Sequence, residues 1–549
     1  MTNTLYYGDN LTILRDYIAD ESVDLIYLDP PFNSNRTYNV LFRSESGSES
    51  EAQIAAFEDT WHWNYHTEQV YNELVTGEWP EVGDMISALR GFIGENQMMA
   101  YLVMMAVRLV ELHRVLKPTG SLYLHCDPTA SHYLKIVLDT IFGFQGFQNE
   151  IVWRRTSAHS DTKQGNVVHM GRVHDIILFY TKSSASTRNA VYTPYRDEYV
   201  NRFYRHKDPD GRRYRLGDLT GPGGAAKGNP EYEFLGVTRY WRYTKENMQR
   251  LYEEGRVVQT RPGAVPAYKR YLDEMPGVSL QDIWDDVSPV SSQAAERLGY
   301  PTQKPVELLK RIVEASSNEG DIVLDPFCGC GTTIAAAQEL NRQWIGIDIT
   351  HLSIALQKYR LKDSFGLVAG EDYQVIGEPV SVASARQLAA DDPYQFQFWA
   401  LSLIQARPYG ASGSSKKGKK GADRGIDGII NFIDDTSKKV KRVIVQVKGG
   451  HVTVSQIRDL VGTVNREEAA IGVFICMGQP TAPMLTEAAT AGHYHSPGWQ
   501  QEYPKIQIFT VDQLLGGTSV RMPPLTITFK QAQRVDDQPG ANQPTLGFE

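Results

Sequence analysis

The sequence predicts an α/β protein in which one sheet is split along the chain and a smaller α/β domain follows. Apolar strands alternate with helical segments over residues 1–182, and the same alternation returns over 296–365. Between them, 183–295 is rich in Tyr, Arg, Gly and Pro and has poor helical periodicity. Alternating strands and helices are typical of a mostly parallel sheet covered by helices.

The first half supplies three strands and a long helix. Val23 to Asp29 is an apolar run of strand length, and 98–116 has the length and period of a buried helix. A turn and strand follow at 117–127, and 173–183 is a further strand. Residues 43–98 interrupt this pattern, and we expect an insertion over the sheet edge.

The second half contains helix, strand, glycine turn, helix, strand and helix. We expect the strands at 321–327 and 343–349 and the helices at 304–317, 333–340 and 352–360. The module at 183–295 is therefore expected to be an irregular or β-rich insertion.

The remaining chain predicts a linker and one more domain. Residues 366–390 are expected to connect the sheet to an α/β unit at 391–530, and 531–549 to form a flexible tail. Within that unit, strands at 442–450 and 471–478 enclose a helix at 454–469.

Composition limits the class of protein. The 549 residues include 41% hydrophobic residues and only four cysteines, too few for a disulfide framework. There is no long uncharged apolar run and no N-terminal signal pattern, so we expect a cytoplasmic protein away from membranes. The net charge of −9 alone disfavours nucleic acid, but 202–215, 414–420 and 438–442 are strongly basic.

The segment "VLDPFCGCGTT" at 323–333 indicates a ligand site. A strand ends at Asp325, and Gly329 and Gly331 open a helix, where a backbone can approach a ligand closely. Asp348 ends the next strand, where a carboxylate can accept hydrogen bonds from ribose hydroxyls. The spacing is G-x-G rather than G-x-G-x-x-G, which disfavours NAD. The pattern favours another nucleoside cofactor over a purely structural turn.

The segment "DPPF", Asp29 to Phe32, follows a strand directly. Prolines fix the backbone and carry no N–H, so they make a rigid platform of a carboxylate, free carbonyl groups and an aromatic ring. Such a platform suits the exocyclic amino group of a planar base. Asp29 and the Pro30 carbonyl can hold its two hydrogens while Phe32 stacks on the ring. A bare strand-terminating turn is the alternative.

These motifs together resemble the amino-methyltransferases of DNA, which methylate adenine N6 or cytosine N4 with S-adenosylmethionine (SAM). The catalytic tetrapeptide precedes the cofactor motif, as in the permuted β class, and the style is that of type III modification subunits. Further matching segments are "YYGDNLTIL", "LKPTGSLYLHCD", "NEIVWRR", "HDIILFYTKS", "DIWDDV" and "YPTQKPVELLKRIV". The resemblance implies a Rossmann-like SAM-dependent fold with 183–295 as an inserted target-recognition module.

The resemblance also implies residue roles. Asp29, Pro30, Pro31 and Phe32 carry methyl transfer. The cofactor residues are Asp9, Asn10, Gln303, Lys304, Pro305, Asp325, Pro326, Phe327, Gly329, Gly331 and Asp348. Asp as the first motif residue favours adenine, because Ser is more usual for cytosine in this class.

The implied substrate is double-stranded DNA, whose target base must be flipped out of the duplex to reach such a pocket. Basic side chains of the module are the candidates for phosphate contacts: Arg202, Arg205, Arg212, Arg213 and Arg215.

The last domain carries "GADRGIDGIINFID" followed by "RVIVQVKGG". A hairpin would bring together Asp427, Gln446 and Lys448, with Asp427 and Gln446 as oxygen ligands of Mg²⁺ and Lys448 orienting a water. This pattern resembles the Mrr-type restriction endonucleases of the PD-(D/E)XK fold. Some members carry an acid on the first helix, where this chain has Gln395 and Gln397, so the metal shell is incomplete by that comparison.

Three functions remain open from the sequence. The first is a fused restriction-modification enzyme with methyltransferase and Mg²⁺-dependent endonuclease. The second is a solitary methyltransferase whose last domain only binds DNA, and the third is a non-catalytic DNA-binding protein, which the intact motifs disfavour. A nuclease cutting both strands favours a homodimer. The sequence has no Walker motif, so any DNA translocation would need a separate restriction or translocase subunit.

Overall fold

The computed structural model describes nine stretches of the chain: residues 2–31, 63–156, 170–291, 294, 296–298, 300, 302–409, 425–434 and 440–524. The predicted residue Phe32, the basic run at 414–420 and the predicted tail at 531–549 lie outside the described residues. The chain divides into two compact units, Met1–Asn189 with Asp282–Glu549, and Ala190–Gln281.

The first unit is built on a nine-stranded sheet in the order β14-β4-β5-β3-β2-β15-β16-β1-β17. Its strands are β1 (Thr4–Tyr7), β2 (Val23–Leu28), β3 (Leu116–Cys126), β4 (Phe147–Trp153), β5 (Asp175–Thr181), β14 (Ile283–Trp284), β15 (Ile322–Asp325), β16 (Gln343–Asp348) and β17 (Gln374–Ile376). All neighbours pair in parallel except β5, which is antiparallel to both β3 and β4. The predicted α/β sheet is confirmed, and it joins strands from the two separated stretches of the chain.

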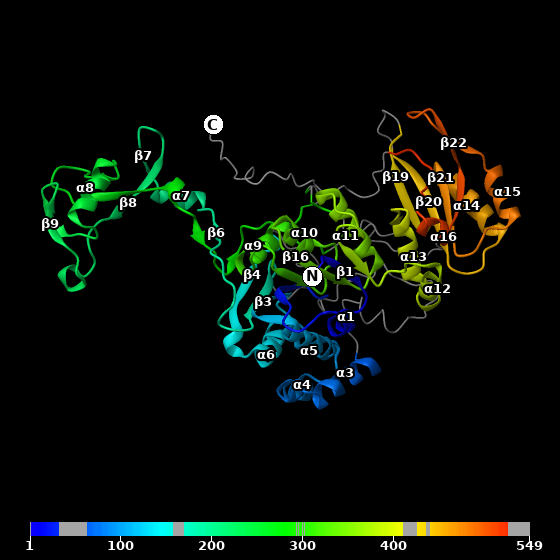
Figure 1. Ribbon diagram of the computed structural model, residues 1–549, viewed down its shortest axis with the longest axis horizontal. Helices are drawn as coiled ribbons and strands as arrows, with labels where there is room; N and C mark the ends of the chain where they lie inside the picture. Colours follow the sequence, from blue (N-terminus) through cyan, green and yellow to red (C-terminus); the bar gives the residue numbers. More distant parts are fainter. Residues whose placement is uncertain are drawn as a thin grey trace. The chain divides into compact units, whose positions relative to one another are not determined.

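Helices cover both faces of this sheet (Figure 1). One face carries α1 (Asn10–Tyr17), α5 (Gln97–Val115) and α6 (Ser131–Phe142), and the other carries α9 (Val306–Ser316), α10 (Thr332–Glu339) and α11 (His351–Phe365). Helix α5 is buried along most of its length, which explains the long apolar run in its sequence. The short 3-10 helix η1 (Phe144–Gly146) leads into β4.

The expected insertion at 43–98 is helical over its described part. Helices α3 (Tyr65–Thr76) and α4 (Pro80–Ile93) form a hairpin whose apolar residues, including Val70 and Ile86, join the core around α5 and α6. The hairpin therefore extends the helical layer on one face of the sheet.

The second unit, Ala190–Gln281, is mostly β, as predicted for the inserted module. A four-stranded antiparallel sheet runs β11-β12-β8-β7, and two strand pairs, β9–β10 and β6–β13, accompany it. The elements are β6 (Tyr192–Thr193), α7 (Asp197–Phe203), β7 (His206–Lys207), β8 (Arg213–Asp218), η2 (Gly224–Lys227), β9 (Glu231–Phe234), β10 (Val237–Tyr240), α8 (Lys245–Glu253), β11 (Val257–Val258), β12 (Ala267–Tyr271), η3 (Leu272–Glu274) and β13 (Val278–Ser279).

This unit is shorter than the predicted span of 183–295. Residues 183–189 and 282–295 belong to the first unit, because β14 pairs with β4 at the edge of the main sheet. Strand β14 has only two residues, which is too short for the alternation of apolar and polar residues that marks a strand in a sequence.

The C-terminal domain contains a five-stranded sheet in the order β18-β19-β20-β21-β24, and a β22–β23 hairpin. Its elements are α12 (Val382–Asp391), α13 (Pro393–Leu403), β18 (Arg407–Pro408), β19 (Gly428–Phe432), β20 (Lys441–Lys448), α14 (Val454–Arg466), β21 (Ile471–Cys476), α15 (Ala482–Thr490), β22 (His493–Ser496), β23 (Gln501–Pro504), β24 (Ile506–Thr510) and α16 (Val511–Leu515). Two apolar clusters pack around this sheet.

The predicted connector at 366–390 is more structured than a linker. Strand β17 extends the main sheet by pairing with β1, and Ala385 of α12 is fully buried in the core of the C-terminal domain. The connector therefore contributes to both neighbours.

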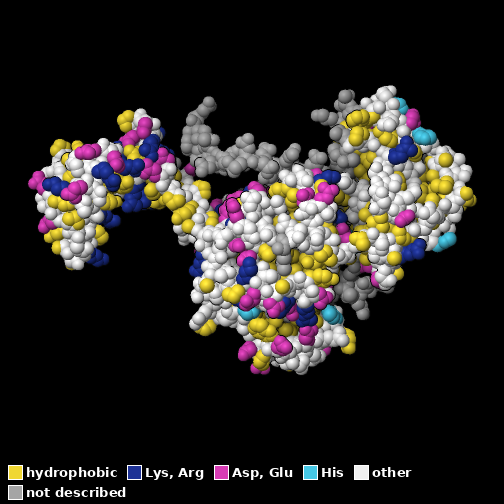
Figure 2. Space-filling view, in the orientation of Figure 1, with side chains coloured by type: hydrophobic (Ala, Val, Ile, Leu, Met, Phe, Trp, Pro, Cys, Tyr) yellow, Lys and Arg dark blue, Asp and Glu magenta, His cyan; other side chains and the backbone are white. Residues whose placement is uncertain are grey.

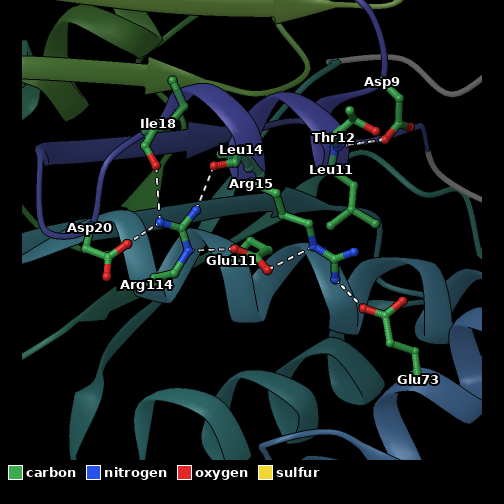
Figure 3. Close-up of polar contacts among 10 residues, drawn as sticks. All are labelled: Asp9, Leu11, Thr12, Leu14, Arg15, Ile18, Asp20, Glu73, Glu111 and Arg114. Atoms are coloured by element: carbon green, nitrogen blue, oxygen red, sulfur yellow. Dashed lines mark hydrogen bonds and ion pairs between the residues drawn. The ribbon is translucent and has the colours of Figure 1, made fainter.

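Helix α5 fixes the C-terminal end of α1 with a guanidinium (Figure 3). Arg114 donates to the Leu14 carbonyl at 2.6 Å and to the Ile18 carbonyl at 3.1 Å, and it pairs with Asp20. A cation at the free carbonyls of a helix end is favourable. Glu111 links Arg114 to Arg15, through contacts of 2.7 and 3.0 Å.

The same helix fixes the N-terminal end of α1. Asp9 caps α1 by accepting hydrogen bonds from the amides of Leu11 and Thr12 at 2.9 and 3.2 Å. Arg108 of α5 donates to Asp9 Oδ2 at 2.8 Å and to Asn10 Oδ1 at 2.6 Å. Helix α5 thereby sets the position of the β1–α1 turn.

Replacing Arg108 is expected to destabilise the fold more than replacing Arg15. Arg108→Met leaves the buried Asn10 oxygen without its donor, which should lower the free energy of unfolding by roughly 2–3 kcal/mol. Arg15→Met removes the two ion pairs of a partly exposed guanidinium and should lower it by less than about 1 kcal/mol. Urea unfolding of both variants measures the difference, and equal losses would contradict this role of Arg108.

Candidate active site

Four aspartates lie at the carboxyl ends of four adjacent parallel strands. Asp29 follows β2, Asp325 ends β15, Asp348 ends β16, and Asp9 follows β1 by two residues. From β2 the chain continues to β3, whereas from β15 it continues to β16 on the opposite side, so the strand order reverses between β2 and β15. Ligands of open α/β sheets bind at such a reversal. Asp29 and Asp325 flank it.

Asp325 organises the glycine turn. It is buried, accepts a hydrogen bond from the Phe327 amide at 3.0 Å through Oδ1, and accepts one from the Thr333 hydroxyl at 2.5 Å through Oδ2. Burial raises the pKa of Asp325 to about 7, and the charges of Asp29 and Asp348 add to the effect.

The turn itself requires glycine at two positions. Gly329 and Gly331 have φ of 50° and 73°, in the left-handed region. A Cβ on Gly331 would stand 2.7 Å from Gln357 Cγ, and one on Gly329 would stand 3.2 Å from the Tyr300 ring. Cys328 and Cys330, which precede these two glycines, are buried packing residues.

Asp348 is partly exposed and joined to the same turn. Its Oδ2 accepts from the Gly329 amide at 2.9 Å, and its Oδ1 accepts from both the amide and the hydroxyl of Thr350 at 2.9 Å. Burial raises the pKa of Asp348 to about 6, and hydrogen bonds from Thr350 and Gly329 oppose the rise. A fixed, partly exposed carboxylate with remaining lone pairs fits the hydroxyls of a ribose.

Asn10, the first residue of helix α1, holds the turn in place. Its Nδ2 donates to the Pro326 carbonyl at 2.8 Å while its Oδ1 accepts from Arg108. Asp9 is likewise used by the helix cap and by Arg108. Both predicted cofactor residues therefore support the site, and Arg108 is a third supporting residue that sequence reasoning missed. Its signal was a cation within the apolar run of the helix.

The segment preceding α9 places a cation on the candidate catalytic carboxylate. Lys304 Nζ donates to Asp29 Oδ2. Gln303 instead bonds within its own segment, to the Glu296 carbonyl at 2.6 Å and from the Leu298 amide at 2.8 Å, and Pro305 caps α9. Of these three predicted cofactor residues, Lys304 is the one that contacts the Asp-Pro-Pro segment, through its bond to Asp29. Pro30, the next residue of that segment, is buried.

A buried polar chain lies behind this platform. Tyr27, two residues before Asp29, pairs its hydroxyl with His125 Nδ1 at 2.9 Å, and His125 Nε2 lies 3.3 Å from Asp175 Oδ2. Burial acts to raise the pKa of Asp175, but the hydrogen bond with His125 and nearby cations hold it below its usual value. His125 and Trp153 are buried and pack edge to face at 5.7 Å. They serve sheet packing.

The hairpin of the C-terminal domain brings its three predicted residues to one end of β19 and β20. Gly428 pairs with Val445, so Asp427 lies opposite Gln446, and Lys448 shares the face of Gln446. Asp427 Oδ2 accepts from the Val447 amide at 2.7 Å, and Gln446 Nε2 donates to the Gly425 carbonyl.

This hairpin offers the oxygens of one carboxylate and one amide to a metal ion. Mg²⁺ keeps several waters and needs few protein oxygens, so the donor types fit. The described residues contain no group of three or more His, Cys, Asp or Glu side chains that could hold a metal ion.

Three of the five predicted DNA-contacting arginines are engaged inside the second unit. Arg212 pairs with Asp273 and Glu274. Arg213 donates to the Tyr204 carbonyl at 3.0 Å, and Arg215 to the Tyr199 hydroxyl at 3.1 Å. Arg202 and Arg205 are exposed. Figure 2 shows basic side chains interspersed with acidic ones on this unit.

A family model described as DNA methylase, of the N6/N4 type, matches residues 23–356. The chain belongs to this family of N6/N4 DNA methyltransferases. A second model, described as NACHT-associated inactive Restriction Endonuclease 1, matches 411–516. No helix within the described stretches is long and apolar enough to cross a membrane.

Individual proteins are also similar to this chain. Type II methyltransferase M.EcaI of Enterobacter cloacae is 29% identical over 352 residues, covering 63% of this chain and 67% of that protein. The Mod subunit of the type III restriction-modification enzyme StyLTI of Salmonella typhimurium is 27% identical over 359 residues, covering 62% and 50%. A putative DNA modification methylase of Thermus thermophilus, whose structure is complexed with S-adenosyl-L-methionine, aligns with 69% of this chain and 99% of that one, with 17% identity and a TM-score of 0.32. The similarity thus spans two thirds of the first relative's length and half of the second's.

Because the pKa of Asp325 is raised, Asp325→Asn is expected to increase the stability of the cofactor-free methyltransferase, by an amount that depends on pH. Because the folded pKa of about 7 lies above the ordinary 3.8, the native state resists ionisation, and stability is lost as pH rises through this window. Neutral Asn avoids that loss. The variant should be more stable than wild type at pH 8, by on the order of 3 kcal/mol, with the gain shrinking towards pH 5.

Thermal unfolding of both proteins across pH 5 to 8 measures this gain. Asp321→Asn, which removes a carboxylate just before β15 and away from the glycine turn, is the control. A stability difference independent of pH would contradict the assignment.

Proposed function

We propose that this chain transfers a methyl group from S-adenosylmethionine to the exocyclic amino group of a flipped base in double-stranded DNA, with adenine N6 as the target. The observation that carries the proposal is the placement of Asp29 and the Asp325–Gly331 turn at the ends of adjacent strands, across the reversal in strand order. The amino group and the methyl donor would then meet in one crevice.

The cofactor end uses residues already fixed by the fold. Asp348 binds ribose hydroxyls, and the glycine turn approaches the cofactor with its backbone. SAM supplies an electrophilic methyl group on sulfur. The donor set fits, because carboxylate oxygens and backbone amides suit hydroxyl and carboxylate groups.

The base end uses the Asp-Pro-Pro platform. Asp29 and the Pro30 carbonyl accept the two amino hydrogens, which holds the nitrogen in line with the methyl group and localises its lone pair. A SAM molecule held here would exchange its S–C bond for the new N–C bond and leave as S-adenosylhomocysteine, and the amino proton on the Asp29 side would pass to water. Lys304 donates to one oxygen of Asp29, Oδ2, and the amino hydrogen is assigned to the remaining lone pairs of this carboxylate.

Adenine is favoured over cytosine because the tetrapeptide begins with Asp. The free energy of flipping, a few kcal/mol, is recovered in the pocket. Arg202 and Arg205 are the predicted module arginines best exposed for phosphate contacts, whereas Arg212, Arg213 and Arg215 shape the module.

Asp29→Ala should abolish methyl transfer while SAM still binds. The measurement is tritium transfer from labelled SAM to DNA, together with calorimetric binding of SAM, and we expect transfer to fall at least ~100-fold with the dissociation constant unchanged within about threefold. Asp16→Ala, on the exposed side of α1, is the control. Transfer that survives in Asp29→Ala would overturn the assignment.

A second function is proposed for the C-terminal domain, namely Mg²⁺-dependent cleavage of unmethylated DNA. The convergence of Asp427, Gln446 and Lys448 at one end of a hairpin favours it. Methylation by the same chain would then protect host DNA, and two copies, or a separate translocating subunit, would serve double-strand cleavage. The matched family is described as inactive, which favours DNA binding alone as the alternative.

Cleavage is tested with unmethylated plasmid, Mg²⁺ and cofactor. Wild type should cut, Lys448→Ala should not, and Lys441→Ala, at the other end of the same strand, should cut normally. If wild type leaves the plasmid intact under every condition, the nuclease proposal fails and DNA binding remains.

A further inference from the structure

Helix α13 of the C-terminal domain contacts the start of α11. His351 is the first residue of α11, and its backbone N–H donates to Gln395 Oε1 of α13 at 3.2 Å. Both residues are almost fully buried, with exposures of 0% and 3%. A side chain of the C-terminal domain thus satisfies a helix-end donor of the methyltransferase sheet.

Thr350 connects this contact to Asp348, the carboxylate proposed to bind ribose. Thr350 caps α11 by accepting from the Ser353 amide at 3.0 Å, and its own amide and hydroxyl donate to Asp348 at 2.9 Å. The position of Asp348 therefore depends on where α11 begins. Gln395 is one of the groups that fix this start.

The surroundings of His351 are packed from several elements. Its ring stacks on Tyr7 with centroids 3.7 Å apart and planes 16° apart, and its Nδ1 lies 3.6 Å from Glu378 Oε1. Tyr7 is paired in register with Asp348. A second bond between the two helices joins the Tyr359 hydroxyl to the Ser402 carbonyl at 3.0 Å. Such a packed polar contact resists small shifts.

The charges nearby explain a neutral amide at position 395. Burial raises the pKa of Tyr7, and three carboxylates, Asp392, Glu378 and Asp348, raise it further. These acids already surround the junction, so a fourth carboxylate on α13 would add like-charge repulsion. Glutamine accepts the His351 hydrogen bond without that charge.

We propose that Gln395 is a positioning residue for the cofactor and that the C-terminal domain forms part of the support of the SAM site. By thermodynamic reciprocity, cofactor occupancy in turn stabilises the start of α13. The inference rests on the proposed methyltransferase function. Position 395 carries an acid in some nucleases of this type. In this chain its glutamine is proposed to support the cofactor site instead.

The direct test is Gln395→Met, which preserves length and removes the acceptor. The orphaned amide should loosen the start of α11, so the KM for SAM should rise on the order of tenfold. The kcat at saturating SAM and the KM for DNA should stay within about twofold. Gln397→Met is the control, because residue 397 is only half-buried and lies about 200° further round the same helix.

An unchanged KM for SAM in Gln395→Met would overturn the inference. A fall in kcat together with a rise in both KM values would also overturn it, because that pattern marks a general loss of structure. Calorimetry of wild type with SAM distinguishes this failure from failure of the methyltransferase proposal. If wild type binds no SAM, the proposed function itself fails; if wild type binds SAM and Gln395→Met has an unchanged KM, only the role of Gln395 fails.

A second measurement uses the unaltered full chain. Amide hydrogen exchange at 393–403 should slow when S-adenosylhomocysteine is added, relative to exchange at helix α15. Equal exchange at 393–403 with and without the ligand would contradict the coupling, whether or not any variant folds.

Discussion

The whole site depends on the parallel alignment of β2, β15, β16 and β1. Parallel strands end at a common edge, so four aspartates that are far apart in sequence converge there without any long-range signal between them. Burial raises the pKa of both Asp325 and Asp348, and at Asp325 the charges of Asp29 and Asp348 add to the rise. The fold holds them by giving each carboxylate hydrogen-bond donors from the glycine turn and from the helix starts that follow it.

Helix α5 carries much of the mechanical support for this edge. Its guanidinium groups hold both ends of α1, and Arg108 reaches the turn through Asn10 and the Pro326 carbonyl. Lys304 contributes differently, by giving Asp29 a counter-ion. Several predicted cofactor residues, namely Asp9, Asn10 and Gln303, thus bond to other parts of the protein. Their contribution to the site is to hold its shape.

The motifs carried most of the predictable information. Asp29, Asp325, Gly329, Gly331 and Asp348 were recognisable because strand ends, prolines and glycines constrain the backbone locally, and those constraints are written in short segments. The supporting contacts were not predictable, because the bonds of Arg108 to Asn10 and of Gln395 to His351 join residues 98 and 44 positions apart. The limits of the inserted module were misplaced for a related reason, since β14 is recognisable only from its pairing with β4. The basic composition of 202–215 also predicted more DNA-contacting arginines than the structure leaves exposed. Arg212, for example, pairs with acids 61 and 62 residues away.

The central claim is that this sheet edge methylates an exocyclic amino group of DNA. The most direct measurement is mass spectrometry of nucleosides released from DNA after incubation with the protein and methyl-deuterated S-adenosylmethionine. The account predicts deuterated N6-methyldeoxyadenosine as the labelled product. Label on carbon 5 of cytosine, or no labelled nucleoside at all, would contradict it.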